Sequence, residues 1–173
     1  MSAKPRDPLL ATSRLLLVIS MATMVATVIA CALGVPGMLI FRGSVAHYFA
    51  GQGAPPDAIW AIVTVSGLVG TISGLGFFFL RHLYRIVGTV GDQDPFVPIN
   101  AERLSAMGWI SLATQVLAIP LFAIGHWLLK VTNHVRVEPD VALSGVLLTV
   151  ILFILARVFR EGTRMRDELE GTV

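Results

Sequence analysis

The sequence is short of charge. Lys, Arg, Asp and Glu make up only 14% of the 173 residues, whereas 55% are hydrophobic, and the mean hydropathy is +0.78. A soluble domain of this size needs more polar surface than such a composition supplies. The net charge of +2 leaves no extended basic face, so we expect no direct contact with a nucleic-acid backbone.

Catalytic and metal-binding motifs are also missing. The single cysteine, Cys31, excludes an intramolecular disulfide, and no nucleophile elbow, phosphate-binding glycine loop or zinc-protease signature is present. His82 and His126 are expected near opposite membrane faces, which does not suit a bis-histidine haem. A metal site built from His47, His126 and His134 is a weak alternative, because no carboxylate lies at ligand spacing. We therefore expect a non-enzymatic protein with no catalytic residues, no cofactor and no metal.

Asp, Glu, Lys and Arg are absent from the four longest apolar stretches as well. These stretches cover residues 15–41, 58–80, 105–129 and 141–156. A helix needs about 20 apolar residues to cross about 30 Å of hydrocarbon, and three stretches meet that length while the fourth falls slightly short. The missing intramembrane charge removes the usual machinery of proton-coupled transport.

This pattern predicts one four-span domain, an all-α integral membrane four-helix bundle whose first partner is the lipid bilayer. The expected helices cover residues 14–35, 57–82, 103–129 and 140–160. A middle loop at 83–102 and a tail at 161–173 complete the chain. We expect Gly34, Pro36 and Gly37 to interrupt the first helix and Pro120 to kink the third.

The basic residues divide unevenly between the two sides of the predicted membrane. With four crossings, ten of the thirteen lie on the side of the termini and the middle loop. Only three lie on the other side: Arg42, Lys130 and Arg136. By the positive-inside rule, both termini, the middle loop and the tail are cytoplasmic, which gives an N-in/C-in topology.

The first stretch admits a second interpretation. A basic start and an apolar run lead to Val28-Ile29-Ala30-Cys31, which is similar to a bacterial lipoprotein cleavage site, and cleavage there would remove the first helix. A cysteine also behaves as a small hydrophobe inside a membrane helix, which is the interpretation that we favour. The intact mass of the protein distinguishes the two.

The second stretch carries a face of small residues. Ser66, Gly70 and Gly74 recur at intervals of four. Small faces let membrane helices approach closely, and lipid gives no hydrophobic drive for association. We therefore predict that this face packs against another helix, within the monomer rather than in a homo-oligomer, which is the alternative.

The middle loop and the tail are the most informative segments after the helices. In the loop, Phe96 lies between two prolines, Asn100 is expected to cap the following helix, and Arg103 is expected to face the headgroups. The tail changes from basic near the membrane to acidic beyond it, with Arg164 and Glu168 at helical spacing.

Four motifs in these segments carry a resemblance. They are Asp94-Pro95-Phe96, Asn100-Ala101-Glu102-Arg103-Leu104, Gly108-Trp109 and Val158-Phe159-Arg160-Glu161-Gly162 with Thr172-Val173. With these motifs the chain resembles the uncharacterised bacterial membrane proteins of domain of unknown function family 2975. The resemblance implies a four-helix, multi-pass inner-membrane protein of undetermined activity, often encoded beside a small helix-turn-helix regulator. Members often have Glu where this chain has Ile99, so no role for a carboxylate carries over.

Our leading hypothesis is a protein that binds a cytoplasmic partner, such as a small helix-turn-helix regulator, through the middle loop and the tail. The candidate partner-binding residues are Phe96, Asn100, Arg103, Phe159, Arg160 and Arg164. The phenylalanines would supply apolar anchors, and the arginines charge complementarity or headgroup contact. The alternative function is that of a small oligomeric transporter or channel subunit. A third possibility is a bundle component that senses lipid or envelope stress.

Overall fold

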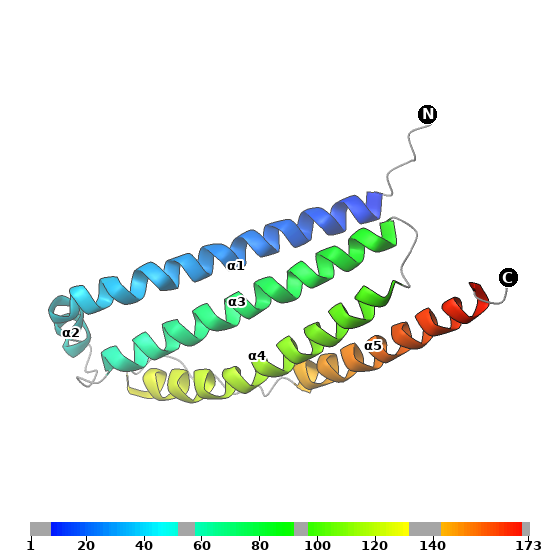
Figure 1. Ribbon diagram of the computed structural model, residues 1–173. Coiled ribbons are helices and arrows are strands. Elements are labelled where there is room, and N and C mark those ends of the chain that lie inside the picture. The colour runs from blue at the N-terminus through cyan, green and yellow to red at the C-terminus, as the bar shows by residue number, and fades with distance from the viewer. Residues whose placement is uncertain (1–7, 52–57, 92–96, 132–142, 171–173) are drawn as a thin grey trace. The chain divides into compact units, whose positions relative to one another are not determined.

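The computed structural model describes residues 8–51, 58–91, 97–131 and 143–170, and the regular structure in these residues is helical. These residues form five helices, whose order along the chain can be followed in Figure 1. They are α1 (Pro8–Ile40), α2 (Arg42–Ala50), α3 (Ala58–Gly91), α4 (Pro98–Val131) and α5 (Leu143–Glu170). All except α2 are long and apolar enough to cross a membrane. The predicted all-α class with four spanning helices is therefore confirmed.

The long helices extend beyond the expected bounds. α3 runs to Gly91 and α4 begins at Pro98, so most of the segment expected as the middle loop is helical. α5 continues to Glu170, through most of the expected tail. The reason is that Arg, Leu, Met and Glu, which follow the apolar runs, are good helix formers. An apolar run therefore marks the membrane-embedded part of a helix, and not its end.

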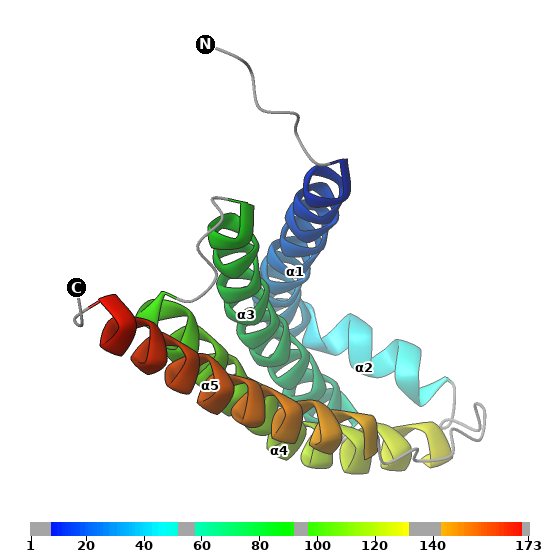
Figure 2. The same ribbon diagram turned by 90° about the vertical axis from the view of Figure 1, so that its right-hand side faces the viewer.

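The expected interruption of the first helix is wrong. α1 continues through Gly34, Pro36 and Gly37 to Ile40. Membrane helices tolerate such residues because a break in the helix would leave several backbone groups unpaired in lipid. That costs more than the one hydrogen bond lost at a proline. The actual break is at Phe41, after which α2 leaves at an angle to α1 (Figure 2).

The helices pack in two compact units, and α1, α3 and α4 each contribute to both. The first unit consists of Met1–Thr23, Gly76–Leu112 and Leu143–Val173, and the second of Met24–Leu75 and Ala113–Ala142. The apolar core of the first unit is built from α3, α4 and α5. Its buried residues are Ile86, Leu104, Met107, Leu152 and Ala156, flanked by Phe79, Leu83 and Phe159.

In the first unit, α5 lies directly against α4 (Figures 1 and 2). A Cβ on Gly108 would come within 2.9 Å of the Phe153 ring, so only glycine fits there without displacement. The Phe153 ring also meets Trp109 edge to face, with 5.5 Å between the ring centroids. Nearby, the Thr149 hydroxyl donates to Ser111 Oγ at 2.8 Å. A small residue and an interhelical hydrogen bond are what close packing of membrane helices requires.

In the second unit, α1 and α3 approach each other at Gly70. A Cβ on Gly70 would lie 3.3 Å from the Cβ of Cys31. A Cβ on Gly74 would have nothing within 4 Å, and Ser66 is half-buried. Gly70 thus lies close to another helix of the same chain, and the packing role of the face formed by Ser66, Gly70 and Gly74 stays a prediction.

Large apolar side chains remain exposed along the long helices. Leu33 is 72% exposed, Ile119 69% and Leu143 80%. Water would make such continuous apolar surfaces unfavourable, whereas hydrocarbon solvates them. The four helices and their surfaces therefore describe a multi-pass membrane protein.

Candidate functional site

Five of the six candidate partner-binding residues lie in the first unit. Asn100 and Arg103 are on α4, and Phe159, Arg160 and Arg164 are on α5. The sixth, Phe96, lies outside the described residues. Partner binding by these residues stays a prediction, but the structure shows what surrounds each of the other five.

Asn100 is completely buried, with 0% of its surface exposed. Its Nδ2 donates to Thr89 Oγ1 on α3 at 2.7 Å, and its Oδ1 accepts a hydrogen bond from Arg103 Nη1 at 3.0 Å. The Thr89 hydroxyl in turn donates to the Ile86 carbonyl at 2.8 Å. The expectation that Asn100 caps the helix is wrong, because α4 begins two residues earlier at Pro98. Its amide instead joins α4 to the end of α3.

Arg103 is half-buried at the same junction. Besides its bond to Asn100, its Nη1 donates to the backbone carbonyl of Arg85 on α3 at 3.4 Å. At that distance the second bond is weak, but it brings the guanidinium alongside α3. Arg103 therefore lies between two helices.

The last four turns of α5, residues 157–170, are here called the α5 extension. Phe159 packs against the core of the first unit, and Thr163, which is 7% exposed, donates to the Phe159 carbonyl at 2.9 Å. Arg160 and Arg164 are exposed. One face of the extension is thus attached to the bundle, and the opposite face is accessible.

The accessible face carries an ion-pair network. Arg164 lies 2.6 Å from Glu161 and 3.8 Å from Glu168, measured between nitrogen and oxygen atoms. The predicted pairing of Arg164 with Glu168 is confirmed. Exposed pairs of this kind contribute little to stability, so the network chiefly fixes where the charges lie.

Two apolar residues on the same face were missed from the sequence. Val158 is 54% exposed and Met165 is 52% exposed. A spacing of seven places them on one side of a helix, two turns apart. The signal was present as two apolar residues at helical spacing within a charged segment, but it could be interpreted only once the segment was known to be helical.

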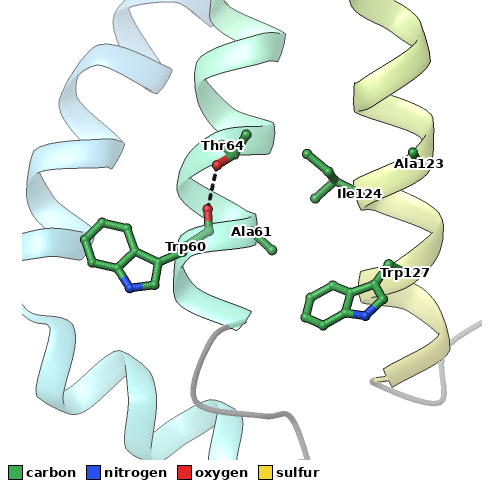
Figure 3. Close-up of a pocket in the computed structure, with 6 residues that line it drawn as sticks. All are labelled: Trp60, Ala61, Thr64, Ala123, Ile124 and Trp127. Atoms are coloured by element: carbon green, nitrogen blue, oxygen red, sulfur yellow. Dashed lines mark hydrogen bonds between the residues drawn. The ribbon is translucent and has the colours of Figure 1, made fainter.

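The second unit contains an open groove of about 400 Å³ between α3 and α4. Its walls are Trp60, Ala61, Thr64, Ala123, Ile124 and Trp127. In Figure 3 the Trp127 ring extends toward α3, whereas the Trp60 ring turns away from α4. The Thr64 hydroxyl donates to the Trp60 carbonyl at 2.8 Å, and the other polar side-chain groups of the lining residues are the indole N–H donors of Trp60 and Trp127.

Metal ligands do not converge in the part of the chain that the structure describes. No three His, Cys, Asp or Glu side chains come close enough there to hold an ion. His134, one member of the weakly expected outer site, is not among the described residues.

A family model described as "Protein of unknown function (DUF2975)" matches residues 76–173, more than half of the chain. Neither a curated protein nor a solved structure matches. The matched region holds the Asn100 junction, the core of the first unit and the α5 extension. The resemblance drawn from the motifs is confirmed, and the chain belongs to the DUF2975 family.

Proposed function

We propose that this chain is a non-enzymatic protein of the bacterial inner membrane that binds a cytoplasmic protein partner through the α5 extension. The observation that carries the proposal is the helical continuation of α5 past its apolar run, attached on one side and accessible on the other. The ten-to-three division of basic residues supports a cytoplasmic position for it. The family resemblance suggests a small helix-turn-helix regulator as the partner.

The accessible face offers three kinds of contact in a fixed order around the helix. Successive residues of a helix are rotated by about 100° about its axis. Around the accessible face, Arg160 and Arg164 therefore lie together, and Glu161 and Glu168 lie beside them. The apolar residues Val158 and Met165 come next. Apolar anchors beside charges of both signs suit a protein groove that accepts one face of a helix. Asn100 and Phe159 support this surface from inside the unit, because both are engaged in its packing.

The test is site-specific photo-cross-linking in intact membranes. We expect a photoreactive residue at Met165 to give a protein adduct, identified by mass spectrometry, and one at the exposed, lipid-facing Ile151 to give none. Arg160→Ala with Arg164→Ala should reduce the adduct yield at least fivefold, whereas Arg14→Ala, a basic residue exposed on α1, should leave it unchanged. An undiminished yield in the double variant would contradict the proposal.

No observation favours the alternative of a transporter or channel subunit. The groove between α3 and α4 is apolar, and the apolar stretches of the four spans hold no Asp, Glu, Lys or Arg. An ion or polar solute crossing lipid needs polar groups to replace its water.

A further inference from the structure

Three arginines converge where α3 meets α4 in the first unit. Arg81 and Arg85 are exposed on α3, one helical turn apart, and Arg103 of α4 reaches the Arg85 carbonyl. Arg81 and Arg85 flank His82 in the sequence of α3. The three arginines are called the arginine cluster below.

The arginine cluster has no neutralising partner among the described residues. The ion pairs found there both belong to α5, and none of the three arginines takes part in one. Glu102 is exposed beside Arg103 in the sequence but forms no ion pair within the described part of the chain. Like charges on neighbouring helical turns and on the helix that contacts them repel one another, so a bound anion would relieve the repulsion.

The depth of the arginine cluster in the membrane identifies the anion. Arg81 directly follows the apolar stretch that ends at Leu80, and Arg103 precedes the one that begins at Ser105. The residues that follow Arg85 and Arg103, Ile86 and Leu104, belong to the apolar core. The guanidinium groups therefore lie at the border between hydrocarbon and headgroups, where lipid phosphates are found.

We propose that Arg81, Arg85 and Arg103 form a binding site for the phosphate of an anionic phospholipid. The planar guanidinium presents paired N–H donors that match phosphate oxygens, and three such groups from two helices can surround one phosphate. The bilayer supplies this ligand to every copy of the protein. The site is separate from the accessible face of the α5 extension, and its test does not depend on a protein partner.

The experiment uses the full-length protein in detergent with added phosphatidylglycerol or phosphatidylcholine. We expect phosphatidylglycerol to be retained in native mass spectra and to raise the melting temperature, and phosphatidylcholine to do neither. Each arginine that contacts the bound phosphate contributes about fivefold to the affinity, so Arg81→Gln with Arg85→Gln should weaken phosphatidylglycerol binding about 25-fold. Both side chains are exposed, and the double variant should therefore fold.

The matched control is Arg14→Gln with Arg42→Gln, which removes two exposed arginines elsewhere and should leave lipid retention unchanged. Equal retention of the two lipids by the wild-type protein would overturn the proposal without reference to any variant. Unchanged phosphatidylglycerol binding in the Arg81, Arg85 double variant would do the same. Displacement of the lipid by millimolar inorganic phosphate would assign the site to a soluble anion and overturn the lipid assignment.

Discussion

At the scale of single residues, the enclosed amide of Asn100 is the most consequential polar group of the first unit. It donates to Thr89 and accepts from Arg103, so its hydrogen bonds connect α3, α4 and the arginine cluster. A buried polar group stabilises a structure only while its partners remain, because each group left unpaired loses its solvation without compensation.

Replacement of Asn100 by leucine should therefore lower the free energy of unfolding by about 2 kcal/mol, since Arg103 loses a buried acceptor and the Thr89 hydroxyl loses a donor. Denaturant titration in micelles measures the change. Glu102→Gln is the matched control, because this neighbouring side chain is exposed and should be close to neutral. Equal stability of the two variants would show that the amide network contributes little.

The sequence indicated Asn100 as important but assigned it the wrong role. Asn before a helical stretch is typical of an N-cap, and the local pattern contains no information on a partner eleven residues earlier. The exposed apolar residues of the α5 extension, Val158 and Met165, were missed for a similar reason. Exposure depends on which neighbouring helix covers a face, and periodicity alone does not identify that neighbour.

At the scale of helices, the contact between α1 and α3 depends on the absence of a side chain at Gly70. The position that a Cβ would occupy is 3.3 Å from the Cys31 Cβ, close to the range of about 3.5–4.5 Å found in disulfides. The only cysteine of the chain thus provides a direct probe of this contact.

In the variant Gly70→Cys, mild oxidation should join Cys31 to the introduced thiol. Loss of both free thiols, measured by alkylation and intact mass, would show the cross-link. Gly67→Cys and Gly74→Cys are matched controls on the same helix, since a Cβ at either position would contact nothing within 4 Å. A cross-link that forms equally well at Gly74 would contradict the packing of α1 on α3.

The helices themselves were largely predictable, whereas their ends were not. The length of an apolar run is a property of the sequence alone, and it identified all four spans. The ends depend on helix propensity outside the membrane, which carried α3 to Gly91 and α5 to Glu170. Pro36 was given too much weight, because the rule that proline ends a helix holds for soluble proteins and was applied here to a helix in lipid.

At the scale of the whole molecule, the N-in/C-in topology stays a prediction from the distribution of basic residues. In a Cys31→Ala background, Ser44→Cys on α2 should react with a membrane-impermeant maleimide in intact cells, because α2 is expected outside. Asp167→Cys on the α5 extension should react only after permeabilisation. Both positions are exposed, so accessibility within the protein does not confound the result. Labelling of Asp167→Cys in intact cells would reverse the orientation.

The four spans also differ in the thickness of bilayer that they match. The apolar run within α5, residues 143–156, rises only about 21 Å, several ångströms less than a typical hydrocarbon layer. Such hydrophobic mismatch is met by local thinning of the bilayer around the short span. We therefore expect the bilayer to be thinner beside α5 and the protein to sort toward membrane regions with short or disordered acyl chains.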